Sequence, residues 1–274
     1  MDYTIDVSVI IPTFNNLSLF KRALNSIIDQ RNVNFEVIIV DDSTNNDIEF
    51  FLSDIKDHRV KYFHNKPNLG AIKNWNYGLN MARGQFVILL HHDESFNDKY
   101  NYLATAISSL RERRADIVVS NIVVNQHDGS SRVAAFPLIL RKIIFNRFLS
   151  ILFALNIIGP VSCVIFKREL ITNFDERLHW LVDVDWYYRI FKGRSVYFDK
   201  SLIVNSMHGH SDQITQNIDI ALQNINDSEV IKNKYNNFPS VLIALWLLKN
   251  TQVLRRIFSK YSNFVWKKNS ESNL

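Results

Sequence analysis

The chain has 274 residues, of which 47% are hydrophobic and 22% are charged, so it can form a full core and is not a disordered chain. Its single cysteine, Cys163, excludes an internal disulfide framework and a cysteine-based zinc site, and no apolar run approaches the roughly 20 residues that span a bilayer. The net charge of +5 is unevenly distributed, because segments 129–168 and 230–270 carry basic residues and no acidic ones.

Strand and helix signals alternate through the first half of the chain. The β-branched run 7–11 predicts a strand that ends at Pro12, and Asn15, Asn16 and Ser18 are candidate caps for the helix that follows. The apolar face of this helix comprises Phe20, Ala23, Leu24, Ile27 and Ile28. Further strands are predicted at 35–40, 60–63, 86–90 and 116–122, and helices at 69–82 and 100–113. This alternation predicts βαβ units and a mainly parallel sheet flanked by helices.

Polar clusters follow four of these strands at the point where each strand ends, at 13–15, 41–43, 64–68 and 91–94. The carboxyl ends of parallel strands meet at one edge of the sheet, where ligands bind, so we expect the clusters to form one site. The last cluster contains His91, His92, Asp93 and Glu94. Charge at the end of a buried strand is costly without a partner, which favours a divalent cation or a reacting group there.

The second half of the chain is less regular. We expect a helix over 138–158, with Arg141, Lys142, Asn146, Arg147 and Ser150 on its polar side and Gly159-Pro160 at its end. A strand at 163–166 is followed by a helix within 180–192, and then by short strands at 196–198 and 202–204. From Pro239 a helical region continues with Lys249, Gln252, Arg256, Lys260 and Lys267 along one side.

Four ordered motifs resemble those of a known family. They are VSVIIPTFNN from residue 7, VIIVDDST from residue 37, NLGAIKNWNYG from residue 68 and ARGQFVILLHHDE from residue 82. In this order and spacing they resemble the family 2 (GT2) inverting glycosyltransferases, of the type that builds bacterial surface polysaccharide. The resemblance is strong over residues 5–125 and weaker over 159–215. It implies an α/β GT-A fold, with a Rossmann-like nucleotide-binding half and an acceptor half.

The resemblance and the charge pattern together predict the domain organisation. A GT-A glycosyltransferase domain is expected over 1–220, divided into a nucleotide-sugar-binding half at 1–125 and an acceptor and catalytic-base half at 126–220. A basic amphipathic helical extension is expected at 221–274.

The resemblance implies that the donor binds to the first half of the chain. Pro12 and Thr13 would line the base pocket and Asp42 would hydrogen-bond the base, usually uracil, although Asp41-Asp42 can equally form a solvated turn or a helix cap. Lys73 would lie beside the nucleotide-sugar, or it can be a solvated helix residue. The implied donor-binding set is Pro12, Thr13, Asn15, Asp42, Asn68, Gly70, Lys73, Asn76, His91 and His92.

The segment His91-His92-Asp93 stands where the family has its D-x-D motif, with His91 in place of the first aspartate. The implied cofactor is Mn²⁺ or Mg²⁺, because a carboxylate suits both ions and an imidazole is compatible with Mn²⁺. Asp93 is the expected ligand, and His91 and His210 are further candidates. The alternative is that both histidines of this segment are hydrogen-bonded polar residues that contact no metal.

The segment LVDVDWYYR, from residue 181, resembles the family's E-D-x-D-L-x-x-R segment. Asp183 stands where the family has its catalytic base, and Val182 replaces the usual glutamate. An inverting transfer needs a carboxylate that accepts the proton of the acceptor hydroxyl. Asp185 is the alternative base, although it can instead cap the helix or pair with Arg189.

The resemblance implies a hexosyltransferase, of EC 2.4 type, that moves one sugar from a nucleotide-sugar, expected to be UDP-linked. The expected acceptor is a saccharide or a lipid-linked saccharide in O-antigen or capsule biosynthesis. Single transfer is expected rather than polymerisation, because the chain has no Q-x-x-R-W motif. A catalytically inactive relative that binds only nucleotide or membrane is the alternative. A Rossmann dehydrogenase is disfavoured, because no G-x-G-x-x-G follows the first strand.

The basic, apolar-faced segments 138–158 and 239–268 fit a protein that binds an anionic membrane surface. Packing of these segments in the core or in a homo-oligomer is the alternative. No nucleic-acid partner is expected, because no reading motif accompanies the basic residues. The start of the chain lacks the basic flank of a signal peptide, so we expect a cytoplasmic protein, or one peripheral on the cytoplasmic face of the inner membrane.

Overall fold

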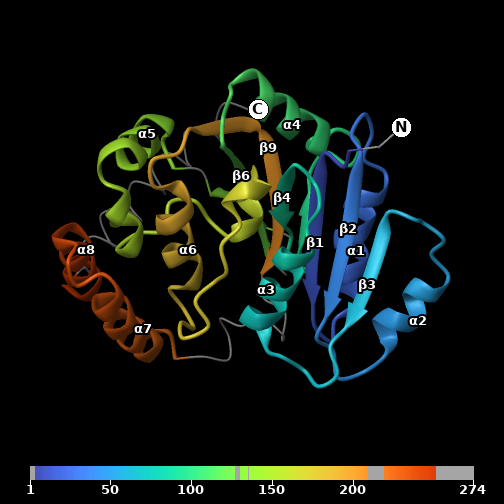
Figure 1. Cartoon of the computed structure of the whole chain (residues 1–274), viewed down its shortest axis with the longest axis horizontal. Coiled ribbons are helices and arrows are strands. Elements are labelled where there is room, and N and C mark those ends of the chain that lie inside the picture. Colours follow the sequence, from blue (N-terminus) through green and yellow to red (C-terminus); the bar gives the residue numbers. More distant parts are fainter. Residues whose placement is uncertain (1–3, 127–129, 135, 209–218, 251–274) are drawn as a thin grey trace.

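The computed structural model describes residues 4–126, 130–134, 136–208 and 219–250. A central sheet runs through this part of the chain, with the strand order β3-β2-β1-β4-β8-β6-β9-β5, and β7 pairs with β6 (Figure 1). Helices flank the sheet, so the α/β class predicted from the sequence is confirmed.

The first half of the chain forms the parallel part of the sheet. Its elements are β1 (Val7–Thr13), α1 (Leu17–Ile28), β2 (Phe35–Asp41), α2 (Asp47–Ser53), β3 (Val60–His64), α3 (Ala71–Met81) and β4 (Phe86–Leu89). β1 pairs in parallel with both β2 and β4, and β2 pairs in parallel with β3. Every residue of β1, β2 and β4 is buried, as expected for strands that are covered on both faces. The predicted cap of α1 is Asn16, whose side chain accepts a hydrogen bond from Leu19 N.

The prediction that the first strand ends at Pro12 was wrong, because β1 continues through Thr13. Leu90 N–H donates to Ile10 O at 2.8 Å, so the backbone polar groups of Ile10 face β4. The backbone of Pro12, two residues further on, faces the same side. The last residue of β4 is Leu89, so the missing N–H of Pro12 falls beyond this ladder and removes no hydrogen bond from it.

The second half of the chain makes the sheet mixed. Its elements are β5 (Glu94–Phe96), α4 (Tyr102–Glu112), β6 (Ile117–Gln126), β7 (Ser131–Ala134), α5 (Leu138–Arg147), η1 (Leu149–Phe153), η2 (Val161–Cys163), β8 (Val164–Lys167), η3 (Arg168–Leu170), α6 (Val182–Phe191), β9 (Val196–His208), α7 (Ile220–Lys234) and α8 (Pro239–Asn250). β8 is antiparallel to both β4 and β6, whereas β9 is parallel to β6 and antiparallel to β5.

The helix predicted over 138–158 is shorter than predicted, and one residue that was assigned to its polar, exposed side faces the core. α5 ends at Arg147, and the chain continues in the 3₁₀ turn η1. Arg141, assigned to the polar side, is buried with its guanidinium over the ring of Phe198 and its Nη1 donating to Asn121 Oδ1 at 3.3 Å. Attraction between the guanidinium and the face of the Phe198 ring offsets part of the cost of burying this charge. The prediction that Pro239 begins a helix is confirmed, because Pro239 is the first residue of α8.

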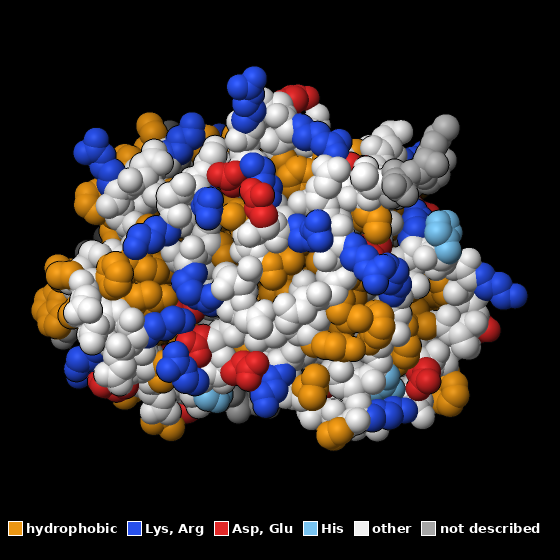
Figure 2. Space-filling view, viewed as in Figure 1, with side chains coloured by type: hydrophobic (Ala, Val, Ile, Leu, Met, Phe, Trp, Pro, Cys, Tyr) orange, Lys and Arg blue, Asp and Glu red, His pale blue; other side chains and the backbone are white. Residues whose placement is uncertain are grey.

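Helices α5 and α8 both pack against η1 and expose apolar side chains to solvent. We call this region the α5–α8 surface, and its apolar residues are Ile139, Ile143, Phe148, Ile243 and Trp246. Figure 2 shows hydrophobic side chains, with Lys and Arg side chains among them, at the left of the molecule where these helices lie. In the described parts of the chain, no helix is long and apolar enough to cross a membrane.

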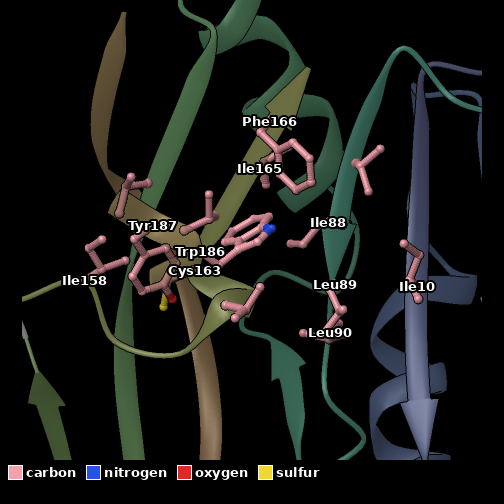
Figure 3. Packing of buried hydrophobic residues seen from close by; sticks show 14 of the residues in the cluster. Ile10, Ile88, Leu89, Leu90, Ile158, Cys163, Ile165, Phe166, Trp186 and Tyr187 are labelled. Carbon is pink, nitrogen blue, oxygen red and sulfur yellow. The ribbon is translucent and has the colours of Figure 1, made fainter. Parts of the chain in front are cut away.

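Helix α6 is fixed to the sheet by large aromatic side chains. Trp186 and Tyr187 are fully buried, and Figure 3 shows them close to residues of β4 and β8. The Trp186 ring meets Phe166 of β8 edge to face at 5.2 Å and stacks on Phe174 at 5.0 Å. Aromatic contacts of this kind bury a large apolar area and have a defined geometry, so they fix the direction of α6. The first turn of α6 carries Asp183.

Candidate active site

The ends of the first two strands are joined by hydrogen bonds between their polar clusters. Asn15 N–H donates to Ser43 Oγ at 2.8 Å, and Asn15 Oδ1 accepts from Thr44 N–H at 2.9 Å. Tyr62 of β3 donates its hydroxyl to Asp41 at 2.8 Å. Thr13 Oγ1 is buried and has no hydrogen-bond partner among the described residues, so it can bond to a ligand.

Asp42 holds the loop that precedes α3. Its carboxylate accepts hydrogen bonds from Leu69 N (2.7 Å), Gly70 N (2.8 Å) and Asn65 Nδ2 (3.0 Å). Asn68 Nδ2 donates to the Asp42 backbone oxygen at 2.6 Å. Asn68 and Gly70 therefore lie directly beside Asp42, as a common donor site requires. A hydrogen bond from Asp42 to a nucleotide base stays a prediction.

Two residues of α3 from the implied donor set differ in their surroundings. Lys73 is exposed. Asn76 is buried, donates to Phe174 O at 3.1 Å and accepts from Phe174 N at 2.7 Å. The Asn76 amide is thus engaged with the backbone of the second half. Trp75 packs against His91, with ring centroids 4.9 Å apart, and so links α3 to the turn after β4.

The turn His91–Glu94 brings together three residues that suit a divalent cation. Ligand atoms of His91, Asp93 and Glu94 all lie within 4.8 Å of one another. His91 Nε2 is buried without a partner among the described residues, and carboxylate oxygens with an imidazole nitrogen suit Mn²⁺. Glu94 was part of the predicted cluster but not of the predicted ligand set. Its place directly after Asp93 was the available signal.

The same turn carries a buried ion pair. Glu94 lies 3.4 Å from His91 Nδ1 and also accepts the His91 backbone N–H at 3.2 Å. Burial alone would lower the pKa of His91. The hydrogen bond and charge of Glu94, helped by Asp93 and Asp183, outweigh burial and raise the pKa of His91 to about 9. In the absence of a metal, His91 is therefore charged at neutral pH.

Asp183 of α6 faces this cluster from the second half of the chain. Burial raises the pKa of Asp183 to about 6, with the charge of Glu94 acting in the same direction and His91 opposing it. Asp183 makes no hydrogen bond or ion pair within the described residues. An aspartate with a raised pKa and free oxygens is suited to accept a proton.

Asp185 is placed very differently. Its fully buried carboxylate accepts hydrogen bonds from Arg189 Nε (2.9 Å), Lys234 Nζ (2.9 Å) and the Tyr235 hydroxyl (2.8 Å). Two cations and a phenol occupy its lone pairs, so it is poorly suited to accept a proton from a substrate. This arrangement favours Asp183 over Asp185 as the base.

Two further points complete the site. Arg22 of α1 was not predicted from the sequence to be a site residue. Its Nε donates to Ser95 Oγ at 3.3 Å, and its guanidinium interacts electrostatically with Asp93. The position of Arg22 on a predicted helix gave no reason to assign it to the site. His208 ends β9, whereas His210, the other candidate ligand, lies outside the described residues.

Sequence comparisons relate the chain to enzymes that transfer sugars. The family model described as glycosyl transferase family 2 matches residues 8–173. An uncharacterized glycosyltransferase of Rickettsia bellii is 27% identical over 77% of this chain and 31% of its own. GalNAc(5)-diNAcBac-PP-undecaprenol beta-1,3-glucosyltransferase of Campylobacter jejuni is 34% identical over 39% of this chain and 34% of its own. The chain spans less than two thirds of the length of the curated relatives that it matches.

Solved structures share the fold. The TarS protein of S. aureus, in complex with UDP-GlcNAc, superimposes with a TM-score of 0.59 at 19% identity, over 85% of this chain and 73% of that one. GalNAc-T7 with UDP, GalNAc and Mn²⁺ superimposes with a TM-score of 0.58 at 17% identity, over 77% of this chain and 45% of that one. At these identities the comparison shows the fold alone, and the fold is GT-A.

Proposed function

The chain belongs to glycosyl transferase family 2, and we propose that it is a nucleotide-sugar glycosyltransferase that transfers one sugar to an acceptor hydroxyl with inversion. The observation that carries this proposal is Asp183. Its carboxyl group has a pKa of about 6 and no hydrogen-bond or ion-pair partner among the described residues, and its charge interacts with the His91–Glu94 turn. A base beside the group that binds the donor is what a single displacement needs.

In the proposed reaction the acceptor oxygen forms a bond to the anomeric carbon while the bond from this carbon to the diphosphate oxygen breaks. Asp183 takes the proton of the acceptor hydroxyl, and the nucleoside diphosphate leaves with the electrons of the broken bond. Because the acceptor attacks opposite the leaving group, the anomeric configuration inverts. With a pKa of about 6, Asp183 is ionised at pH 7 and is a stronger base than an ordinary aspartate.

The cofactor that we propose is Mn²⁺ or Mg²⁺, held by His91, Asp93 and Glu94. The short distances between their ligand atoms and the unpartnered His91 Nε2 support this set. His91 can bind a metal only in its neutral form, so binding would displace its proton. When bound, such an ion offsets the negative charge that develops on the leaving diphosphate. The Mn²⁺ in the structure of GalNAc-T7 is consistent with this cofactor.

We propose a UDP-linked donor, bound along the ends of β1 and β2 and the loop before α3. The proposed contacts are Pro12, Thr13, Asn15, Asp42, Asn68, Gly70, Lys73, His91 and His92, without Asn76, whose amide is engaged with the backbone of Phe174. The unpartnered Thr13 Oγ1 and the joined loops support this location. The complexes of TarS with UDP-GlcNAc and with UDP support the choice of nucleotide.

The acceptor that we propose is a lipid-linked saccharide in the biosynthesis of bacterial surface polysaccharide. The named substrate of the Campylobacter jejuni relative is a saccharide on undecaprenyl diphosphate, which supports this class. The α5–α8 surface supports it independently, because exposed apolar residues lie beside the exposed basic residues Lys142, Arg147 and Lys249. We infer that this surface binds the anionic cytoplasmic face of the membrane that carries the acceptor.

A donor screen tests the proposed function. UDP-, GDP- and dTDP-sugars are added with and without Mn²⁺, and thermal unfolding and release of nucleoside diphosphate are measured. We expect a UDP-sugar to raise the unfolding temperature in the presence of Mn²⁺, and we expect Asp93→Asn to abolish the effect of the metal. Asp54→Asn, an exposed change at the C-cap of α2, is the matched control.

Two outcomes would contradict the proposal. One is that no nucleotide-sugar stabilises the protein, and the other is that Asp93→Asn keeps the full effect of Mn²⁺. Binding of a UDP-sugar without any turnover, in the presence of lipid-linked acceptors, would instead identify a catalytically inactive relative.

A further inference from the structure

Helix α7 contacts the segment that leads into α6 through one buried carboxylate. Asp227, which is fully buried, accepts hydrogen bonds from three consecutive backbone N–H groups: His179 N (3.0 Å), Trp180 N (2.6 Å) and Leu181 N (2.7 Å). Successive N–H groups of this kind form a concavity that binds an anion. In this protein the anion is a side chain that lies more than 40 residues further along the chain.

The sequence around the start of α6 provides no side-chain cap, and Asp227 is the carboxylate found at this end of the helix. The first N–H groups of a helix have no partner within the helix, and Leu181, the N-cap of α6, makes no side-chain cap bond. Of the three N–H groups that bond to Asp227, that of Leu181 belongs to this set, whereas those of His179 and Trp180 precede the helix. A carboxylate at this end also interacts favourably with the helix dipole. Asp227 therefore holds the start of α6 from a different helix.

The same helix holds α6 at a second point. Lys234 Nζ lies 2.9 Å from Asp185 and 2.8 Å from Asp175, and the Tyr235 hydroxyl donates to Asp185 at 2.8 Å. Asp227 and Lys234 are seven residues apart, which places them on one side of α7. Leu181 and Asp185 are thus both fixed by α7, and Asp183 lies midway between them in the sequence.

We propose that Asp227 is a positioning residue for sugar transfer, because it fixes the backbone that carries Asp183. Asp183 itself makes no hydrogen bond or ion pair within the described residues, so its location depends on the backbone on either side of it. A displacement of about 1 Å between reacting groups can lower a rate about 100-fold. This inference rests on the proposed role of Asp183 as the base.

The first test is Asp227→Asn, which keeps the size of the side chain but places an amide against backbone N–H groups. We expect kcat to fall about 10- to 100-fold at a temperature well below unfolding, with the KM for the donor unchanged within about twofold. Glu229→Gln, an exposed change on the same helix, is the matched control and should leave both constants as in the wild type. A wild-type kcat in folded Asp227→Asn would overturn the proposal.

A double-mutant cycle separates positioning from a general effect on folding. If Asp227 acts through Asp183, then Asp227→Asn should lower the residual rate of Asp183→Asn less than about twofold. An equal factor in both backgrounds would overturn the proposal. Near-normal transfer by Asp183→Asn alone would instead contradict the proposed base, so the two failures can be distinguished.

A milder variant applies if Asp227→Asn does not fold. Tyr235, the residue after α7, donates its hydroxyl to Asp185, and Tyr235→Phe removes this hydrogen bond and leaves no unpaired charge. We expect a smaller fall in kcat, about threefold, with an unchanged donor KM, because Arg189 and Lys234 still hold Asp185 in this variant. Tyr77→Phe, on an exposed tyrosine of α3, is the control. An unchanged kcat in Tyr235→Phe would count against positioning by α7.

Discussion

Asp183 and His91 both have a pKa above the ordinary value, and both lie in the proposed site. The pKa of Asp183 is raised to about 6 by burial, and the pKa of His91 is raised to about 9 by its carboxylate neighbours in spite of burial. The positive charge of His91 opposes the rise in the pKa of Asp183. Without that charge the pKa of Asp183 would be higher still. The pair therefore keeps Asp183 ionised, and basic, near pH 7.

The first prediction concerns the pH dependence of transfer. Asp183 accepts a proton only when it is ionised, so kcat should rise with pH through a limb at or below about 6, because a bound cation lowers the pKa of a nearby carboxyl, and level off above it. The measurement is kcat at saturating donor, acceptor and Mn²⁺ between pH 5 and 8. A kcat that falls steadily as the pH rises from 5 to 8 would be incompatible with Asp183 as the base.

The second prediction concerns stability. The pKa of Asp183 in the folded protein is about 6, above its value of 3.8 without the fold, so ionisation opposes folding. Each unit of pKa difference is worth about 1.4 kcal/mol, so Asp183→Asn should raise the free energy of unfolding by up to about 3 kcal/mol above pH 6. Below about pH 4 the acid is protonated in both states and the gain should vanish. Urea unfolding at pH 8 and pH 4, with Asp54→Asn as control, measures both values.

At the scale of elements, α6 depends on the buried cluster around Asp185. Arg189 and Lys234 both place their positive charge against this carboxylate, and Tyr235 donates a hydrogen bond to it. Such a cluster fixes where α6 begins. It explains why two aspartates, two residues apart on one helix, are suited to different roles.

The third prediction follows from this cluster. Asp185→Asn removes the negative charge and leaves two partly buried cations without it, so the free energy of unfolding should fall by about 3–5 kcal/mol. Urea unfolding at pH 7 checks the value. The acidic limb of kcat should persist in this variant, because Asp183 remains. Loss of that limb without loss of stability would identify Asp185, not Asp183, as the base.

The elements that the sequence predicted well are those with a strong local pattern. β1, β2 and β4 are continuous apolar runs, and each is fully buried. β5 was missed because it has only three residues, Glu94–Phe96, and two of them are polar. The runs 196–198 and 202–204 belong to one strand, β9, because its ladder with β6 continues across an irregularity. Backbone pairing, which side-chain patterns do not report, joins them.

The site residues likewise include some that a local sequence motif indicated and others that no local pattern indicated. Asp93 and Asp183 were found because they stand within motifs. Asp227 carries no such signal, since its partners at 179–181 lie more than 40 residues away and contribute only backbone N–H groups. Arg141 was assigned to the wrong side of its helix, because the pattern treats every arginine as solvated. Contacts between distant segments are fixed by the fold and not by local sequence.

At the scale of the whole molecule, the proposed donor site lies on the first half of the chain, and the α5–α8 surface lies on the second half. The expected extension from residue 221 starts within α7. Asp227 and Lys234 of α7, and Tyr235 just after it, contact α6 and the segment before it. The contacts of α7 with α6 therefore connect the C-terminal helices to the segment that carries the proposed base.

The fourth prediction concerns this surface. Replacing Ile243 with Ser and Trp246 with Ala, both well exposed on α8, should reduce retention on vesicles that contain phosphatidylglycerol, and 0.5 M salt should weaken the binding of the wild type. Phe50→Ala, an equally exposed apolar change on α2, is the control. If the α8 variant and Phe50→Ala are retained equally well, the proposal that the α5–α8 surface binds a membrane is contradicted. Dissociation of a dimer by the same substitutions would identify a homo-oligomer contact instead.

The central claim is that Asp183 is the base of a glycosyl transfer, and one measurement tests it most directly. Acceptor-dependent release of nucleoside diphosphate is measured for the wild type and Asp183→Asn at pH 7.5, with the nucleotide affinity of both proteins determined alongside. The account predicts that kcat falls at least about 100-fold while the affinity is unchanged. A kcat within about twofold of the wild type, with normal nucleotide binding, would contradict it.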